Sequence, residues 1–289
     1  MLASEKIRAL NRFGLGARPG EVLGLDPKQW LRSQVISQPV AIQGLKLETT
    51  QQLLEEINSI RRDGMSVQSR KNLRKQAVKQ EEAEIMALVN HGLRTDTPFT
   101  ERLVRFWSNH FTVSSHGEQV VRYLAGAYER EAIRPHVFGK FLDMVIATAR
   151  HPAMLVYLDQ VRSVGPNSKV GRRRNLGLNE NYARELMELH TLGVDGGYDQ
   201  ADVEALAKIL SGWTTGGLWG KSSEQVTPFK FKASLHEPGT KILLGQKISE
   251  SGEQEGLDAI KLLVGHPSTA RFVATKLVRH FVQDIPVES

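Results

Sequence analysis

The string from 177 to 193, GLNENYARELMELHTLG, holds the densest set of side chains able to transfer protons. Asn179 is a favourable helix N-cap and Gly193 a favourable helix stop, so the string predicts a helix. Two carboxylates held near each other raise the pKa of one of them, which lets it donate and accept a proton. We therefore predict that Glu180 or Glu185 is a catalytic general acid/base.

The same predicted helix carries side chains suited to holding a substrate. We predict that Arg184 orients an anionic group and that Asn181 binds substrate beside it. A structural interpretation stays open, because Glu180, Arg184 and Glu188 also have the i,i+4 spacing of surface ion pairs. Such pairs stabilise a helix by about 0.3–0.5 kcal/mol each.

A second polar string, FWSNHF over 106–111, places an imidazole beside aromatic rings. Helical spacing makes Phe106 the i,i+4 neighbour of His110. The functional interpretation makes His110 a general base, a proton partner of the glutamates or a metal ligand, with Asn109 binding substrate. The alternative is a hydrogen-bonded core histidine at the end of a helix.

A third string, YEREAIRPH over 128–136, ends its helix at Pro135, because proline cannot continue an α-helix. Within this string Glu131 has two candidate ion-pair partners, Arg130 and Arg134. The spacing leaves open which of them it contacts.

Basic side chains are concentrated in one segment. The net charge is +6, and residues 161–175 hold five basic residues and no acid. Because the rest of the chain is nearly neutral, the broad basic face of a duplex-DNA binder is not expected, and nucleic acid is not an expected partner. Arg172, Arg173 and Arg174 are predicted to bind an anionic group of the substrate. A mobile basic loop is the alternative.

Familiar catalytic and cofactor motifs are absent. The chain has no H-E-x-x-H, P-loop, G-x-S-x-G or Rossmann glycine sequence, and no motif implies a cofactor. The lack of cysteine excludes disulfides, thiolate nucleophiles and cysteine–zinc sites. No two of the nine histidines are three or four residues apart, so a metal would need ligands from separate helices. Candidates are His110, His151 or His190 with a glutamate.

Helices must position these side chains, because 3.6-residue periodicity dominates the chain. Besides a helix that begins at Asp26-Pro27, helices are predicted over 4–12, 48–62, 66–94, 99–112, 118–134, 138–149, 179–191, 199–211, 253–264 and 267–282. In the 66–94 helix, the charged first half is expected to be a solvent-exposed arm. The more apolar second half, from Ile85 onward, is expected to dock on the core.

One region alternates with period two instead. Phe229–Lys232 and Lys241–Lys247 are predicted to pair as a hairpin around Pro238. The predicted fold class is therefore mainly α, an irregular multi-helix array with one small β-hairpin. We expect a main helical domain over 1–215, and a second unit over 216–289 with the hairpin and two helices.

The composition is that of an ordinary globular protein, with 40% hydrophobic and 24% charged residues and a mean hydropathy of -0.31. No run of 18 apolar residues occurs, so no transmembrane segment is expected. The first residues contain no secretory signal, which predicts the cytoplasm for this chain. The periplasm is the alternative if an export signal has been removed.

Six strings occur together in order: LNRFG, FWSNHF, EAIRP, HPAM, NENYARELMEL and LSGW, beginning at residues 10, 106, 131, 151, 179 and 210. As a set they resemble the bacterial domain-of-unknown-function family numbered eighteen hundred, over about residues 6 to 282. The resemblance implies a mainly helical protein, often exported and often encoded beside a sulfatase-like protein with a twin-arginine signal. Family members usually continue past a string like KLVRHF at 276–281, which implies a short or truncated form here.

Two functions of different classes are predicted, and the sequence does not decide whether the chain is an enzyme. The leading prediction is an acid/base or metal-assisted hydrolase or lyase acting on an anionic or polyhydroxylated substrate. Its site would lie where the 99–112 and 179–191 helices meet. The alternative is a non-catalytic adaptor. Its 66–84 arm and 161–175 loop would bind a protein partner such as the sulfatase-like neighbour.

Overall fold

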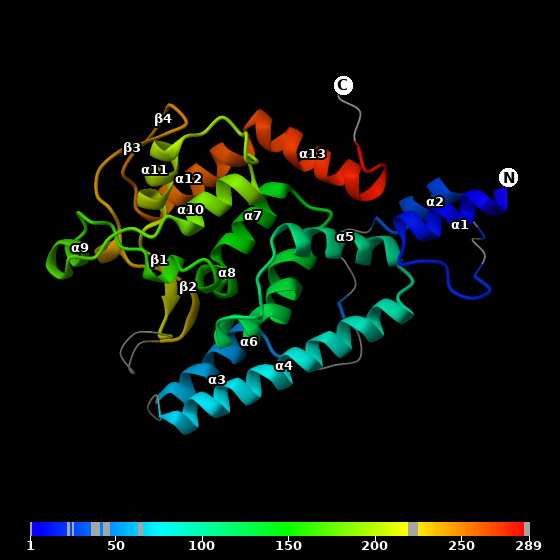
Figure 1. The fold of residues 1–289 in the computed structure, drawn as a ribbon, viewed down its shortest axis with the longest axis horizontal. Coiled ribbons are helices and arrows are strands. Elements are labelled where there is room, and N and C mark those ends of the chain that lie inside the picture. The colour runs from blue at the N-terminus through cyan, green and yellow to red at the C-terminus, as the bar shows by residue number, and fades with distance from the viewer. Residues whose placement is uncertain are drawn as a thin grey trace.

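A computed structural model describes residues 2–21, 24, 26–35, 41–42, 47–62, 66–218 and 225–285. Helices of very different lengths cross at many angles and form an irregular array (Figure 1). Thirteen of them in the described residues are α-helical. They are α1 (Leu2–Phe13), α2 (Pro27–Ser33), α3 (Thr50–Arg62), α4 (Val67–Arg94), α5 (Pro98–His110), α6 (Gln119–Tyr128), α7 (Phe141–Arg150), α8 (Pro152–Tyr157), α9 (Lys169–Arg174), α10 (Asn181–Glu185), α11 (Gln200–Leu210), α12 (Glu253–Val264) and α13 (Pro267–Phe281). The predicted mainly-α fold class is confirmed.

Two of the predicted helices change their winding part-way. The 118–134 helix is α6 followed by a π-helical turn, η1 (Glu129–Ile133), and a 3₁₀ turn, η2 (Arg134–His136). Proline within η2 has no N–H to continue the α-helical ladder. The 179–191 helix is likewise α10 followed by a π-helical turn, η4 (Leu186–His190). Such turns are frequent at functional sites.

One apolar cluster forms the main core. Leu124 and Met154 in the first part of the chain and Leu243 and Ile260 in the last part all belong to it, and all four are buried. The division into two units at residue 215 stays a prediction. A second, small cluster joins α1 to α2 through Leu10 and Trp30.

The long helix α4 packs against α3 and α6 (Figure 1). Its first half buries Leu73 and Ala77, so the prediction that this half is a free arm is wrong. The second half does dock, as predicted, but it docks through Ala87 and His91 and leaves most of its large apolar residues exposed. Four of them are 48–68% exposed: Ile85, Met86, Val89 and Leu93. Glu84 faces α6 instead, in the space that Gly126 leaves by having no side chain.

Strand pairing differs from the predicted hairpin. Strand β1 (Trp213–Gly216) pairs antiparallel with β2 (Thr227–Phe231), and β3 (Lys241–Leu243) pairs antiparallel with β4 (Gln246–Ile248). The predicted pairing of 229–232 with 241–247 is therefore wrong. Leu244 and Gly245 both have positive φ, which makes a tight two-residue turn inside the second segment. Residues 241–248 therefore form a hairpin of their own. Strand β2 pairs with β1, which follows α11.

The segment predicted as a basic loop also contains regular structure. A 3₁₀ turn, η3 (Gln160–Arg162), precedes α9, which is capped by the Ser168 side chain. A third 3₁₀ turn, η5 (Ala233–Leu235), lies between β2 and β3. Within the described ranges, no helix combines the length and the apolar character needed to cross a bilayer.

Candidate functional site

His110 ends α5 in the interior of the protein, inside a group of rings. Its imidazole lies 4.6–6.4 Å, centroid to centroid, from the rings of Phe106, Trp107, Phe111, Phe141, Phe272 and His190. Nε2 donates a hydrogen bond to the backbone carbonyl of His190 at 3.0 Å. Nδ1 lies 2.8 Å from the Nζ of Lys276, on α13.

These two contacts define the protonation of the ring. A carbonyl oxygen only accepts hydrogen bonds, so the Nε2 of His110 carries the proton and Nδ1 accepts from Lys276. Burial and the nearby Lys276 ammonium lower the pKa of His110 to about 4. The geometry is that of the hydrogen-bonded core histidine given above as the alternative. A catalytic role for His110 stays a prediction.

Glu180 and Arg184 form the surface pair that helical spacing allows. The Nη2 of Arg184 lies 3.2 Å from Oε2 of Glu180 and also donates to the side chain of Gln200 at 3.0 Å. The Gln200 amide donates back to Glu180 at 2.8 Å. The three side chains thus satisfy one another at the start of α10 and α11.

Glu185 lies in a different environment from Glu180. Burial and the neighbouring Glu188 carboxylate raise the pKa of Glu185 above its ordinary value. Burial and Glu188 also raise the pKa of Tyr198. The carboxylate that acts on Glu185 is therefore Glu188, and a catalytic role for Glu185 stays a prediction.

The other predicted binding residues lie on the surface. Asn109 and Asn181 are exposed. Arg172, Arg173 and Arg174 are exposed on α9, and none forms an ion pair with a residue that the structure describes. Neither nitrogen of His110 is bonded to a glutamate of the described chain. The structure therefore joins α5 to η4 at His110 and His190, without joining His110 to Glu180 or Glu185.

A cation site is not formed by the predicted histidines. No group of three or more His, Asp or Glu side chains in the described residues has the arrangement needed to hold a metal ion. Burial lowers the pKa of His151 and of His190 to about 3, so both rings are neutral near pH 7.

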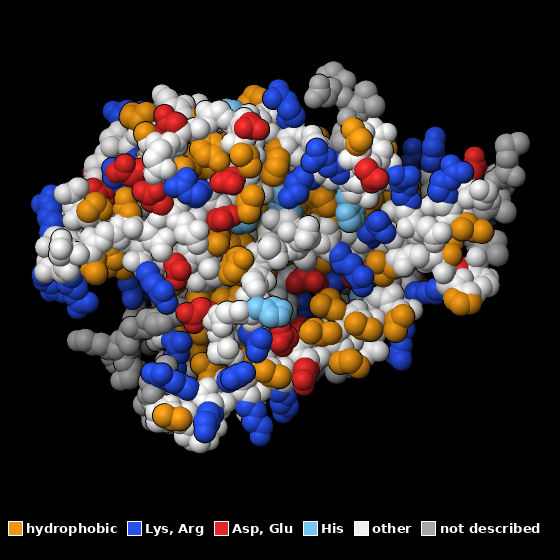
Figure 2. All heavy atoms as spheres, viewed as in Figure 1, with side chains coloured by type: hydrophobic (Ala, Val, Ile, Leu, Met, Phe, Trp, Pro, Cys, Tyr) orange, Lys and Arg blue, Asp and Glu red, His pale blue; other side chains and the backbone are white. Residues whose placement is uncertain are grey.

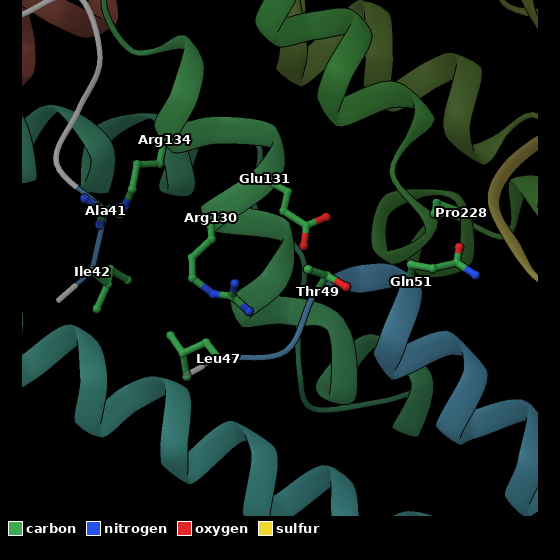
Figure 3. Close-up of a pocket in the computed structure, with 9 residues that line it drawn as sticks. All are labelled: Ala41, Ile42, Leu47, Thr49, Gln51, Arg130, Glu131, Arg134 and Pro228. Atoms are coloured by element: carbon green, nitrogen blue, oxygen red, sulfur yellow. The ribbon is translucent and has the colours of Figure 1, made fainter. Parts of the chain in front are cut away.

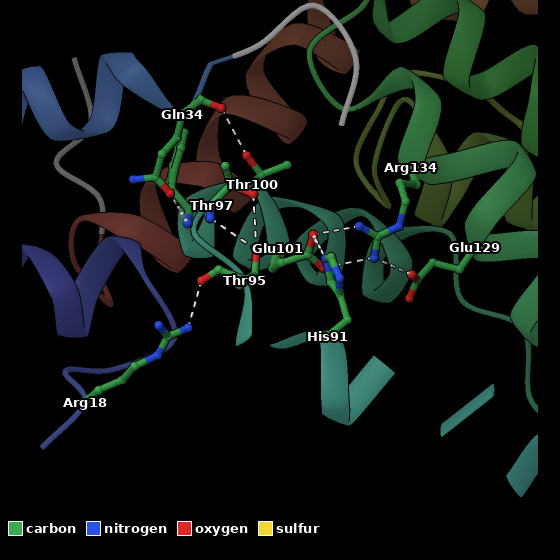
Figure 4. Close-up of polar contacts among 10 residues, drawn as sticks. Arg18, Gln34, His91, Thr95, Thr97, Thr100, Glu101, Glu129 and Arg134 are labelled. Atoms are coloured by element: carbon green, nitrogen blue, oxygen red, sulfur yellow. Dashed lines mark hydrogen bonds and ion pairs between the residues drawn. The ribbon is translucent and has the colours of Figure 1, made fainter. Parts of the chain in front are cut away.

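A buried network of charged side chains lies instead between α4, α5, η1 and η2. Arg134 bonds to both oxygens of Glu101, at 2.6 and 2.9 Å, and to Glu129 at 3.1 Å. His91 contacts Glu101 at 3.0 Å (Figure 4). Arg130 makes a similar two-point contact with Glu84, at 2.8 and 3.2 Å.

The pKa values of Glu101 and Glu129 shift in opposite directions, because the two carboxylates have different partners in this network. Glu101 is desolvated by burial, but hydrogen bonds from Arg134 and His91 outweigh that effect and hold the pKa of Glu101 below its ordinary value. Burial raises the pKa of Glu129, where the single bond from Arg134 compensates less. Perturbed carboxylates of this kind cluster at functional sites, although structural networks also produce them.

A pocket opens beside the network. Its volume is about 420 Å³, and its walls are Ala41, Ile42, Leu47, Thr49, Gln51, Arg130, Glu131, Arg134 and Pro228. We call it the Arg130 pocket. Figure 3 shows Arg130, Glu131 and Thr49 around its centre, with Ala41 and Ile42 along one side. One oxygen of Glu131 accepts the backbone N–H of Thr50 at 2.8 Å, at the first residue of α3.

Sequence reasoning identified one part of this site and missed the rest. The third string singled out Glu131, Arg130 and Arg134, but the predicted ion pair of Glu131 with one of these arginines is wrong, because Arg130 pairs with Glu84 and Arg134 with Glu101 and Glu129. Glu84 and Glu101 were missed, although both occupy helix positions otherwise filled by buried residues. A charged residue within a buried stripe was the available signal.

Comparison with known proteins identifies the family of this chain. A family model described as "Protein of unknown function (DUF1800)" matches residues 8–289. The chain belongs to this family. The curated proteins contain no match, and neither do the solved structures. Membership of DUF1800 carries no activity with it, so the function has to be argued from the side chains themselves.

Proposed function

We propose that this DUF1800 protein is an acid/base enzyme, a hydrolase or lyase acting on an anionic or polyhydroxylated substrate held in the Arg130 pocket. The observation that carries the proposal is the position of Glu131. One carboxylate oxygen is held by the Thr50 N–H, and the other makes no hydrogen bond with a described residue. A carboxylate held at one oxygen and open at the other suits proton transfer.

The neighbouring groups suit the same chemistry. The Nε and Nη2 of Arg130 are occupied by Glu84 and by the carbonyl of Glu48, whereas Nη1 makes no hydrogen bond with a described residue. Arg130 can therefore orient a substrate oxygen with Nη1 while Glu84 holds its guanidinium in place. Glu84 acts as a positioning residue in this proposal.

Glu131 would first take a proton from a substrate hydroxyl, an activated carbon or a water molecule. It would then return that proton to the leaving oxygen, so that the carboxylate is regenerated. Positioned acid/base groups contribute about 10²- to 10⁴-fold in rate.

The test is turnover of Glu131→Gln. Glutamine keeps an oxygen to accept the Thr50 N–H but cannot accept a proton. Aryl glycosides, polyuronates, sulfated sugars and phosphate esters form the substrate panel. We expect the variant to lose at least about 100-fold in turnover with an unchanged melting temperature. Glu82→Gln, an exposed glutamate on α4, is the matched control.

Retained turnover in Glu131→Gln would contradict the proposal. Glu185→Gln and His110→Ala belong in the same assay, because they test the site predicted from helical spacing. If Glu185→Gln abolishes turnover and Glu131→Gln does not, the reaction centre lies at η4 instead of η1.

A non-catalytic adaptor is the second candidate, and the exposed face of α4 favours it. Ile85, Val89 and Leu93 recur at four-residue spacing and form an apolar stripe with Met86 (Figure 2). Basic residues occupy the same helix toward its first turn: Arg70, Lys71, Arg74, Lys75 and Lys79. Exposed apolar stripes with charged borders are typical of protein-binding surfaces.

Co-purification with the sulfatase-like protein implied by the family tests the adaptor. We expect Val89→Glu to abolish a stable complex and Val194→Glu, at an exposed valine far along the chain, to leave it intact. A complex that survives Val89→Glu would exclude α4 as the contact surface.

A further inference from the structure

The open hydrogen-bonding groups of the Arg130 pocket restrict what it can bind. Among the described residues, Nη1 of Arg130 and Nε of Arg134 are donors without a partner. The second oxygen of Glu131 is an acceptor that no described residue uses. Only Nε of Arg134 is a buried atom, whereas Glu131 is exposed at the mouth of the pocket. A ligand that carries both hydrogen-bond donors and acceptors can pair with all three groups.

The formal charge of the pocket is already balanced at its arginines. Arg130 is matched by the two-point contact with Glu84, and Arg134 by the two-point contact with Glu101. Glu131 is left as the charged group without a cationic partner in the described residues. The pocket is therefore not a site of excess positive charge, despite its two arginines.

This balance disfavours a phosphate or sulfate ligand. Sulfate has acceptors but no donor for Glu131, and the Glu131 carboxylate repels both sulfate and hydrogen phosphate. The guanidinium groups are already neutralised by Glu84 and Glu101, so an added anion would bring a second negative charge beside those carboxylates.

An amine is disfavoured because, once protonated, it supplies hydrogen-bond donors but no acceptor. An ammonium group can donate to Glu131, but it has no lone pair to accept from Arg130 Nη1. A hydroxyl group donates and accepts at once. Arg130 and Glu131 form no ion pair with each other, so a hydroxyl can lie between them and contact both.

The rest of the lining fits a ligand with C–H faces as well as hydroxyls. Ala41, Ile42, Leu47 and Pro228 are apolar, and Thr49 and Gln51 add neutral polar groups. The volume of about 420 Å³ lies in the range of small-ligand pockets. We infer that the pocket takes an uncharged polyhydroxylated molecule of sugar size, with one hydroxyl bridging Arg130 Nη1 and Glu131. This inference rests on the proposed function only for the location of the site.

Equilibrium binding tests the inference without any turnover. The probes are glucose, galactose, mannose and their disaccharides, with inorganic phosphate, inorganic sulfate and methylammonium as contrasts, measured by calorimetry on the full chain. We expect saturable binding of at least one sugar and none of the three ions. Glu131→Gln should weaken sugar binding by roughly tenfold to a hundredfold, the loss expected for a hydrogen bond to a charged group.

Two further variants make the outcome decisive. Ala41→Trp places a large ring in the pocket at an exposed position and should abolish binding without unfolding the chain. Glu82→Gln should bind as the wild type does. Saturable phosphate, sulfate or methylammonium binding that Ala41→Trp removes would overturn the inference, and so would the absence of binding by every sugar. Sugar binding without turnover would uphold the inference and contradict the proposed enzyme.

Discussion

Arg134 holds Glu101 through two parallel hydrogen bonds, although both side chains are only 5% exposed. The two residues come from different elements, η2 and α5, and they are 33 positions apart in the chain. Ion pairs buried this deeply depend on both partners, because a single charge left in the interior has no compensation. The pair also positions the wall of the Arg130 pocket.

Removing one partner of this pair should therefore destabilise the protein strongly. We expect Arg134→Met to lower the free energy of unfolding by about 3–5 kcal/mol, measured by urea denaturation. Arg184→Met removes the cation of the surface pair with Glu180 and should change it by less than about 1 kcal/mol. Equal losses in the two variants would contradict the assigned difference in burial.

Close helix packing at Gly126 supports the same network. A Cβ at this position would overlap the side chain of Glu84, which would have to leave Arg130. We expect Gly126→Ala to destabilise the protein by about 1–3 kcal/mol, despite the better helix propensity of alanine. Gly117 has open space around it, so Gly117→Ala is the matched control and should be neutral or slightly stabilising. A stable Gly126→Ala protein would show that α4 and α6 can separate without penalty.

Acid should unfold the protein through its buried histidines. The pKa values of His110, His151 and His190 in the folded state are about 4, 3 and 3, below the ordinary value of 6.5. Between the folded and the ordinary pKa values, each imidazole therefore binds a proton in the unfolded state but not in the folded state. The stability contributed by these groups is present above pH 6.5 and is lost as the pH falls toward the folded values.

Replacement of His151 tests this pH dependence. His151→Asn keeps a side-chain cap for α8, where Nδ1 accepts the Ala153 N–H, but removes one titrating group. Urea denaturation between pH 6.5 and 4.5 should show a slope lower by about 1.4 kcal/mol per pH unit. An unchanged slope would mean that this imidazole is protonated in the folded state as well.

The pKa of His110 should depend on the neighbouring Lys276. Lys276 contributes, after burial, to the low pKa of His110, so Lys276→Met should move that pKa upward, toward its ordinary value. Nitrogen-15 NMR of the imidazole should report a proton on Nε2 in the wild type, since Nε2 donates to the His190 carbonyl. A proton on Nδ1 would contradict the contact with Lys276.

Several features follow from residues that are close in sequence. The predicted helix over 253–264 is α12 with the same bounds, because its apolar residues recur at helical spacing. Gly193 has a positive φ where a helix stop was predicted. The contact between Glu180 and Arg184 needs only four residues of helix. In each case local spacing is sufficient, because the residues involved are close neighbours in the sequence.

The interior network and the Arg130 pocket depend on tertiary structure. Glu84 and Arg130 are 46 positions apart, and they meet only because α4 lies against α6 at Gly126. The π-helical turn of η1 changes the direction of the residues after Tyr128, which helical spacing does not predict. Sequence periodicity determines which residues share a face of a helix. Which faces meet is decided by the packing of the whole chain, and that packing placed Glu131 and Arg130 at a common pocket.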